Sequence, residues 1–313
     1  MKLKKPKFWD YQRPNFLSYF LLPLTLPVII NNFLLNLKEN TQQKHKIKKI
    51  CIGNIYIGGT AKTPLTIKIY QILNTLGIKV ATIKKFYKSH YDEQKILSQK
   101  TIFYCEKKRV QALNKAIQDK MGVVVFDDGL QDRSINYDLK IVCFNSIKSI
   151  GNGLLIPAGP LREKINSISK YDAAFINGNE KDNSKLKSLL KKYNAHIEIF
   201  ESSYKAINIK DLDIKDEYII FSGIGNPESF KQILINNSIK IAKEIIFPDH
   251  HKYTQKDIDY IKFQARQLNS KILTTEKDYI KIKSNNNNDI KQLKVELDIK
   301  NENKLIDYLK IHI

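Results

Sequence analysis

At 313 residues, the chain is long enough to bury a large hydrophobic core in one large domain or in two smaller ones. Its formal net charge of +21 suits an anionic partner or a generally solvated basic surface, but scattered lysines and the lack of Arg/aromatic interleaving argue against a nucleic-acid-binding protein. Three isolated cysteines (Cys51, Cys105 and Cys143) have neither metal-ligand spacing nor a disulfide framework, which fits a reducing compartment.

The first 37 residues combine positive charge with an apolar stretch. Five basic residues precede residues 16–37, which carry no formal charge and contain two prolines. The prolines disfavour a membrane-spanning helix, and no small-x-small cleavage site follows to mark a secretory signal. We therefore expect residues 1–37 to form a membrane-associated helical anchor at the bilayer surface, with a first core helix of the soluble domain as the alternative.

Residues 53–64 (Gly-Asn-Ile-Tyr-Ile-Gly-Gly-Thr-Ala-Lys-Thr-Pro) form the most informative motif. They follow a short apolar run typical of a buried strand and precede apolar residues at helical spacing over 65–76. A glycine-rich turn between a strand and a helix lets backbone N–H groups surround a polyphosphate. In this phosphate loop, Lys62 would reach the β- and γ-phosphates and the Thr63 hydroxyl would bind Mg²⁺.

Two positions of this motif depart from the GxxxxGK[ST] pattern. Tyr56 stands at the first glycine, and Ala61 stands at the glycine before the lysine. A glycine turn followed by an exposed Lys-Thr pair is therefore the alternative interpretation. Pro64 suits the first turn of a helix, and residues 80–83 read as a second strand, so the segment has the order of a βαβ unit.

The rest of the chain alternates between apolar runs and helical patterns. A helix is expected at 109–121, and strands are expected at 123–126, 141–144 and 173–176. A second series follows, with strands at 218–221, 245–247, 272–274 and 295–299, helices at 227–234 and 255–268, and a loop at 285–288. Such alternation predicts an α/β fold: a P-loop-type parallel sheet covered by helices, with a second, smaller α/β lobe.

We accordingly expect three parts in the chain. Residues 1–37 would form the basic and apolar anchor, and residues 38–200 the P-loop core. Residues 201–313 would form the second α/β lobe, which would close an active-site cleft.

Polar residues follow several of the predicted strands. Asp127 and Asp128 follow a buried strand, where open α/β sheets place ligands and where a carboxylate can hold Mg²⁺. An Asp-Asp-Gly turn is the alternative. Asp92 and Glu93 read most simply as a solvated acidic pair, although one of them could accept the proton of an attacking hydroxyl.

Two further segments carry polar side chains in unusual surroundings. Residues 151–163 concentrate glycine and proline in a glycine-poor chain, and Arg162 near their end could clamp a phosphate. Asp249 precedes two histidines, His250 and His251, and could orient a base. A His-His pair without further spaced ligands is weak support for zinc.

Taken in chain order, these motifs resemble those of the tetraacyldisaccharide 4′-kinase family. The matching segments are residues 53–64, 92–93, 127–131, 151–163, 222–227, 247–251 and 274–278. The resemblance implies ATP- and Mg²⁺-dependent phosphorylation of the 4′-hydroxyl of tetraacyldisaccharide 1-phosphate, which gives lipid IVA in lipid A biosynthesis. It also implies a lipid disaccharide substrate, a place on the cytoplasmic side of the inner membrane, a catalytic domain facing the cytoplasm, and no obligate protein partner.

The resemblance also implies a role for individual residues. The catalytic residues would be Asp92, as base toward the sugar hydroxyl, His250, which supports it, and Lys62. ATP would be bound by Gly58, Gly59, Thr60, Ala61, Lys62, Thr63 and Arg162. The metal site would use Thr63, Asp128 and Glu163, with Glu93, Asp127 and Asp249 as supporting carboxylates.

Some positions differ from the family's usual pattern. Residues 84–87 read Lys-Lys-Phe-Tyr where Ser-Arg-Gly-Tyr is common, and Asp132 follows Gln131 where a histidine is usual. Two other functions stay open at this point. One is a P-loop ATPase or GTPase that couples hydrolysis to a partner protein, and the other is a membrane-bound nucleotide-binding module without catalysis.

Overall fold

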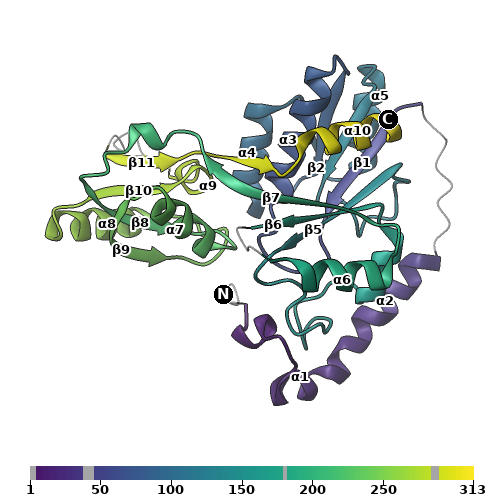
Figure 1. The fold of residues 1–313 in the computed structure, drawn as a ribbon, viewed down its shortest axis with the longest axis horizontal. Coiled ribbons are helices and arrows are strands. Elements are labelled where there is room, and N and C mark those ends of the chain that lie inside the picture. The colour runs from purple at the N-terminus through teal and green to yellow at the C-terminus, as the bar shows by residue number, and fades with distance from the viewer. Residues whose placement is uncertain (1–4, 38–45, 179–181, 283–288) are drawn as a thin grey trace. The chain divides into compact units, whose positions relative to one another are not determined.

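The structure, a computed structural model, describes residues 5–37, 46–178, 182–282 and 289–313 (Figure 1). Contacts within the chain divide these residues into two units. The larger unit takes in residues up to Phe86, Leu97–Ser203 and Ile299–Ile313, and the smaller unit takes in Tyr87–Ile96 and Tyr204–Asp298. The loop expected at residues 285–288 lies outside the described residues.

An eight-stranded sheet in the order β12-β7-β6-β5-β1-β4-β2-β3 forms the centre of the larger unit, although residues 295–298 of the edge strand β12 are grouped with the smaller unit. Every pairing from β7 across to β3 is parallel. The strands are β1 (Lys48–Gly53), β2 (Val80–Lys85), β3 (Phe103–Glu106), β4 (Val123–Asp127), β5 (Leu139–Asn145), β6 (Ala173–Asn177), β7 (Glu198–Ala206) and β12 (Val295–Ile299). All five residues of β4 are buried, because a parallel strand covered on both faces needs a continuous apolar run.

Helices cover this sheet. The covering α-helices are α3 (Lys62–Thr75), α4 (Tyr91–Lys100), α5 (Arg109–Gln118), α6 (Ser184–Tyr193) and α10 (Glu302–His312). The N-terminal part of the unit contains α1 (Phe16–Phe20) and α2 (Leu26–Leu37), and short 3₁₀ helices are η1 (Lys7–Asp10), η2 (Leu22–Thr25) and η4 (Ile165–Lys170). Helix α4 begins in the smaller unit and ends in the larger one. The predicted P-loop-type sheet with flanking helices is confirmed.

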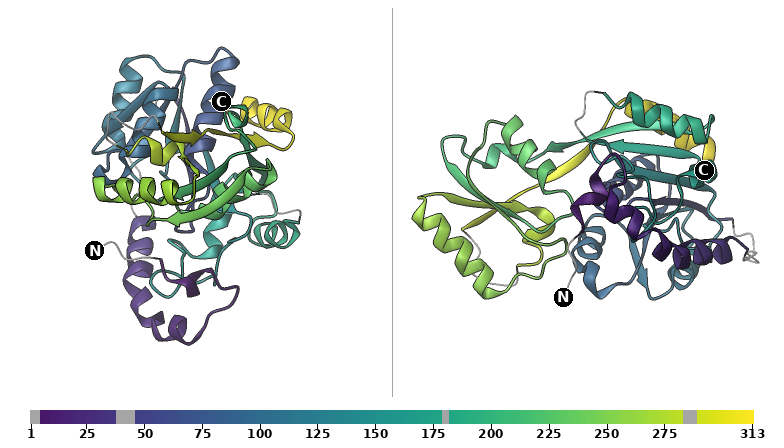
Figure 2. Two further views of the ribbon diagram at one scale, coloured as in Figure 1. Left: turned by 90° about the vertical axis from the view of Figure 1, so that its left-hand side faces the viewer. Right: turned by 90° about the horizontal axis from the view of Figure 1, so that it is seen from below.

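The smaller unit is a separate α/β layer structure (Figure 2). Its four strands are all parallel in the order β11-β10-β8-β9, with bounds β8 (Glu217–Ser222), β9 (Lys240–Ile246), β10 (Lys271–Thr275) and β11 (Ile290–Leu293). Its helices are α7 (Pro227–Asn236), α8 (Gln255–Gln267) and α9 (Glu276–Tyr279), with 3₁₀ turns η3 (Lys88–His90) and η5 (Ile209–Asp211). Alternate residues of β8 pack with α7 on one face and with α8 on the other, which gives three layers.

The units differ from the predicted ranges at two places. Residues 87–96 pack with the smaller unit, although they precede most of the larger one in sequence. The last fifteen residues, from Ile299 at the end of β12, return to the larger unit, where α10 buries Leu305 and Leu309. Lys68 of α3 forms a 2.8 Å ion pair with Glu302 of α10 and holds this last helix in place.

The N-terminal elements η1, α1, η2 and α2 present many apolar side chains to solvent. Phe16 is 82% exposed, Phe20 is 72% exposed and Phe33 is 61% exposed. Exposed aromatic residues at this density are unusual for a soluble surface. Across the described ranges, the structure contains no helix with the length and apolar content that crossing a bilayer requires.

Candidate functional site

The phosphate loop lies between β1, near the middle of the larger sheet, and the N-terminus of α3. The buried side chain of Asn54 shapes it by donating to the Tyr56 carbonyl at 2.5 Å and to the Thr60 hydroxyl at 3.1 Å. The same amide lies 3.4 Å from the Gly58 carbonyl. These bonds fold the loop back on itself, so its backbone N–H groups are held near the positive end of the α3 dipole.

Ala61 is the N-cap of α3 and has a left-handed backbone conformation, with φ 64° and ψ 24°. Glycine adopts this conformation without steric cost, whereas a β-carbon there costs on the order of 1 kcal/mol. The sequence departure at this position therefore keeps the glycine-like turn and adds strain to it.

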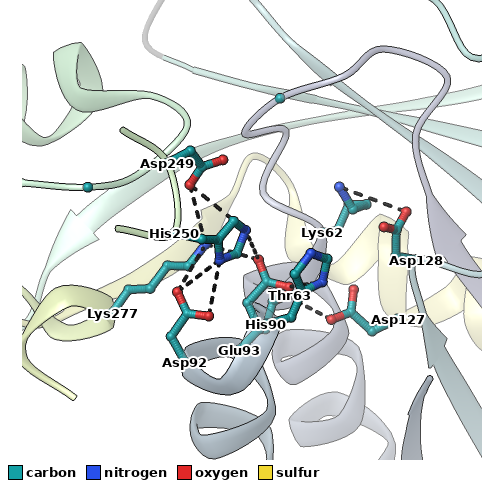
Figure 3. Close-up of polar contacts among 12 residues, drawn as sticks. Lys62, Thr63, His90, Asp92, Glu93, Asp127, Asp128, Asp249, His250 and Lys277 are labelled. Atoms are coloured by element: carbon teal, nitrogen blue, oxygen red, sulfur yellow. Dashed lines mark hydrogen bonds and ion pairs between the residues drawn. The ribbon is translucent and has the colours of Figure 1, made fainter. Parts of the chain in front are cut away.

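Thr63 and Asp127 meet at the carboxyl end of β4, as Figure 3 shows. The Thr63 hydroxyl donates to Asp127 Oδ2 at 2.7 Å, and the Lys84 ammonium lies 2.7 Å from the same oxygen. All three side chains are buried. Within the described ranges, no donor reaches the other oxygen of Asp127, which leaves one carboxylate oxygen available to a ligand.

Asp128 lies next to two cationic side chains of the same unit. Its Oδ1 is 3.1 Å from Nη1 of Arg162 and 3.9 Å from Nζ of Lys62 (Figure 3 shows the Lys62 contact). The residue has a left-handed φ of 57°, and the buried guanidinium of Arg109 donates to its carbonyl oxygen. Arg109 also pairs with Asp132 at 2.9 Å, so the unusual Asp132 contributes to holding the Asp128 backbone.

Glu163 is buried in a small polar network. Its carboxylate accepts hydrogen bonds from Gln131 at 2.8 Å and from the Tyr171 hydroxyl at 3.1 Å, and Arg133 lies 3.7 Å away. Gln131 in turn donates to the Asn54 carbonyl at 3.0 Å and accepts from Arg162 at 3.2 Å. Glu163 thereby fixes a glutamine that touches both the phosphate loop and Arg162.

The oxygen-bearing side chains around the phosphate loop fit Mg²⁺. Thr63 offers a hydroxyl, Asp127 offers an unused carboxylate oxygen, and Asp128 offers a second carboxylate. Mg²⁺ is commonly held by one or two carboxylates and the phosphates of a nucleotide, not by a cage made of protein alone. Among the described residues, no group of three or more His, Cys, Asp or Glu side chains could hold a metal ion.

A second polar cluster belongs to the smaller unit, where the ends of β8, β9 and β10 meet the first turn of α4. Nδ1 of His250 lies 3.2 Å from both carboxylate oxygens of Asp92 (Figure 3). The backbone N–H of His250, which has a left-handed φ of 56°, donates to the Gly223 carbonyl after β8. The structure thus brings together two residues that the family resemblance linked and that lie far apart in the sequence.

Two lysines also face the carboxylate of Asp92. Lys281 lies 3.3 Å from it and Lys277 lies 3.6 Å from it, and Lys277 also pairs with Glu93 at 3.0 Å. Burial raises the pKa of Asp92, but the bond with His250 and the charges of the lysines outweigh burial and hold that pKa well below its ordinary value. Asp92 is therefore ionised at neutral pH.

The Lys281 ammonium is itself held by α9 and β8. It lies 2.8 Å from Oδ1 of Asp278 and donates to the Gly223 carbonyl at 3.2 Å. Asp278 also accepts from the Gly223 N–H at 3.0 Å and from the Thr275 hydroxyl at 2.7 Å. These bonds make the segment 274–281 a rigid support for the Asp92 carboxylate.

The two neighbouring histidines have different surroundings. The His250 ring stacks on His90 with centroids 4.6 Å apart and planes 9° apart, which fixes the orientation of the imidazole. His251 stacks on Phe247 and lies 3.1 Å from Asp257, away from Asp92. Asp249 lies at the edge of the cluster, 3.9 Å from Nε2 of His250.

Comparison with known proteins now places the chain in a family. The family model described as LpxK, tetraacyldisaccharide-1-P 4′-kinase, matches residues 17–102 and 91–313. The chain belongs to this family. The predicted resemblance is confirmed, and the chain is a kinase of a family that transfers phosphate to a hydroxyl.

Named relatives agree with the family match over nearly the whole chain. The tetraacyldisaccharide 4′-kinase of Pelagibacter ubique is 47% identical over 310 residues, which cover 99% of this chain and 98% of the relative. The enzyme of the same name from Rickettsia canadensis is 34% identical, and the match covers 97% of this chain and 96% of the relative. The crystal structure of LpxK from Aquifex aeolicus in complex with ATP shares the fold, with a TM-score of 0.69 at 22% identity. The match covers 95% of this chain and 100% of that structure.

Several polar residues of these clusters were given no functional role by the sequence. Asn54, Lys84, Arg109 and Lys281 were not singled out for any role, although each is bonded to a predicted site residue or to the phosphate loop. Lys84 carried a signal, because it departs from the family's usual serine directly after the predicted strand at 80–83. The others carried none, since their partners are distant in sequence.

Proposed function

We propose that this chain transfers the γ-phosphate of ATP to the 4′-hydroxyl of tetraacyldisaccharide 1-phosphate, forming lipid IVA in lipid A biosynthesis. Family membership over nearly the whole chain carries the proposal. Two features of the structure support it: a phosphate loop whose Thr63 is bonded to Asp127 in the larger unit and an ionised aspartate paired with histidine in the smaller unit.

The larger unit would bind the nucleotide. The N–H groups of residues 58–61 and the start of α3 would donate to the phosphate oxygens, and Lys62 and Arg162 would neutralise their charge. Mg²⁺ held by Thr63, Asp128 and the unused oxygen of Asp127 would add positive charge where negative charge builds up in the transition state. Asp127 would orient Thr63, and Glu163 would support the site through Gln131.

The smaller unit would activate the acceptor. The 4′-hydroxyl oxygen attacks the γ-phosphorus, the bond to the β–γ bridging oxygen breaks, and ADP leaves with the electron pair. Asp92 accepts the hydroxyl proton in this step, while His250 and the lysines beside it hold the carboxylate in place and ionised. Glu93 and Asp249 would balance the positive charge of Lys277, which lies within 4.0 Å of both.

The N-terminal elements would place the enzyme at the cytoplasmic surface of the inner membrane. The exposed aromatic side chains of α1 and α2 suit the interface between lipid headgroups and acyl chains, and Lys7 and Arg13 suit anionic lipid. A substrate with four acyl chains stays in the bilayer, so an enzyme that rests there can meet it. No nucleic acid and no obligate protein partner is part of this proposal.

Transfer of ³²P from γ-labelled ATP to tetraacyldisaccharide 1-phosphate in mixed micelles with Mg²⁺ tests the function. Labelled lipid from the wild type, and at least 100-fold less from Lys62→Ala, is the expected result. Lys185→Ala, which removes an exposed lysine of α6, is the matched control and should match the wild type. ATP hydrolysis without labelled lipid would favour the partner-coupled NTPase, and binding of MgATP without either activity would favour the non-catalytic module.

A further inference from the structure

The N-terminal segment (residues 5–37) is bonded to the loop of residues 151–163, which we call the bridging loop. The buried indole of Trp9 donates to the Pro157 carbonyl at 3.0 Å, and the Trp9 carbonyl accepts from the Asn152 N–H at 3.0 Å. A β-carbon at Gly151 would lie 2.2 Å from that same carbonyl oxygen, so only glycine permits this approach. The Asn152 amide also donates to the buried Ser18 hydroxyl of α1 at 3.0 Å.

The bridging loop is bonded in turn to the phosphate loop. The Arg162 N–H donates to the Ile55 carbonyl at 2.7 Å, and the Ile57 N–H donates to the Pro160 carbonyl at 2.9 Å. Tyr56 and Leu161 lie opposite each other in an antiparallel bridge. The backbone that carries Arg162 therefore follows the backbone of the phosphate loop.

Tyr56 connects the phosphate loop to the N-terminal segment directly. Its ring is buried among the core residues of the larger unit, and its hydroxyl donates to the carboxylate of Asp10. Lys5 contacts both the hydroxyl and that carboxylate. Burial, together with the bond to Asp10, raises the pKa of Tyr56 well above its ordinary value, so the hydroxyl keeps its proton as a donor.

Asn32 of α2 is bonded to the backbone of a residue that the proposed function assigns to nucleotide binding. Its side-chain amide donates to the backbone carbonyl of Arg162 at 2.9 Å. The helix that carries Asn32 also carries exposed Ile30, Phe33 and Leu34. The proposed lipid-facing helix is thus one hydrogen bond away from the arginine proposed to contact ATP.

We propose that Asn32 and Tyr56 are positioning residues for the nucleotide site, through which the N-terminal segment holds Arg162 and the phosphate loop in their binding geometry. The inference rests on the nucleotide role of Arg162 in the proposed function. It adds that the N-terminal segment contributes to ATP binding even where no lipid is present. If the N-terminal segment served only as a membrane anchor, changes in it would affect how often the enzyme meets its lipid substrate and would leave ATP binding unchanged.

The test is the dissociation constant for MgATP, measured by titration calorimetry on full-length protein in mild detergent without lipid substrate. Asn32→Leu removes the amide at similar volume, and Asn31→Leu is the matched control at the adjacent, exposed position. A lost hydrogen bond of about 1 kcal/mol corresponds to a dissociation constant about 5-fold higher. We expect this increase for Asn32→Leu and none for Asn31→Leu, with equal thermal midpoints for the two variants.

A mutant cycle with Arg162→Ala separates positioning from a general loss of structure. If Asn32 acts through Arg162, Asn32→Leu has no further effect on ATP binding once Arg162 is Ala. Additive effects in the double variant would overturn the inference, as would equal dissociation constants for Asn32→Leu and Asn31→Leu. Unchanged ATP binding in Arg162→Ala would overturn the nucleotide role of Arg162, on which the inference rests. The proposed kinase function itself is tested separately, by transfer of labelled phosphate to the lipid.

Tyr56→Phe provides a second variant in case Asn32→Leu does not fold. It deletes only the hydroxyl and leaves the buried ring in the core. We expect weaker MgATP binding with KM for ATP raised and kcat in saturating ATP within about 2-fold of the wild type, because the hydroxyl touches no reacting group. Unchanged KM for ATP in this variant would overturn the part assigned to Tyr56.

Discussion

Nδ1 of His250 lies 3.2 Å from both carboxylate oxygens of Asp92, and the histidine ring is held flat against His90. Asp92 is only 2% exposed, so water contributes little to the stability of its charge. Its charge is stabilised instead by His250, Lys277 and Lys281. A carboxylate that is buried, ionised and held from several sides has the fixed position that a catalytic base requires.

Replacing Asp92 with asparagine keeps the shape of the side chain and removes its ability to accept a proton. We expect Asp92→Asn to lower kcat for lipid phosphorylation by at least about 100-fold, with ATP binding within about 2-fold of the wild type. Steady-state kinetics and calorimetry measure the two quantities. Glu93→Gln, at the next position, is the control and should lose far less activity. Turnover near that of the wild type in Asp92→Asn would remove Asp92 from the mechanism.

Through its charge, Lys281 should influence the pH below which Asp92 becomes protonated and kcat/KM falls. Because its ammonium favours the ionised carboxylate, Lys281→Met should raise the pKa of Asp92, and the acidic limb of kcat/KM should move to higher pH by about one unit. Lys231→Met, which breaks an ion pair with Glu244 on α7 and β9, is the control and should leave the profile unchanged. An identical acidic limb in wild type and Lys281→Met would show that Lys281 does not tune Asp92.

The same depressed pKa has a consequence for folding. A carboxylate whose pKa is lower in the folded than in the unfolded protein stabilises the fold above the unfolded value of about 3.9, and this contribution is lost as pH falls through the folded value. We therefore expect the difference in free energy of unfolding between wild type and Asp92→Asn to be constant above about pH 5 and to shrink toward acid. Urea unfolding at a series of pH values measures it. A difference that grows toward acid would contradict the assigned direction.

The buried pair of Lys84 and Asp127 should matter for stability. Lys84→Met leaves the Asp127 carboxylate without its cation in a fully buried place, which typically costs about 3–5 kcal/mol of unfolding free energy. Chemical denaturation measures this loss. Lys85→Met, at the less buried next position of β2, should cost less than about 1 kcal/mol, and Asp127→Asn in the Lys84→Met background should recover part of the loss. If Lys84→Met lowered the free energy of unfolding no more than Lys85→Met does, the Lys84–Asp127 pair would not be important for stability.

The larger sheet could be predicted because its strands are short, continuous apolar runs such as Val123–Asp127, and because the phosphate loop has a local signature. Strand β7 was not predicted, since its burial alternates irregularly and it carries charged residues. The support of Asp92 by His250 was implied only by the family resemblance, because 158 residues separate the two and no local pattern in the sequence connects them. Asp92 lies in the first turn of α4, and nothing in the local sequence indicates that this turn packs with the smaller unit.

Ala61 offers a test of strain in the phosphate loop. Because its φ of 64° is left-handed, Ala61→Gly should raise the free energy of unfolding by about 1 kcal/mol, despite the greater freedom that glycine gives the unfolded chain. Ala116→Gly, in the regular helix α5, should do the opposite and lower it by at least about 1 kcal/mol. Urea denaturation of both variants measures the two signs. If Ala61→Gly destabilised the protein as Ala116→Gly does, the left-handed turn would not be the strained conformation of this loop, and the methyl group of Ala61 would instead contribute packing that glycine cannot replace.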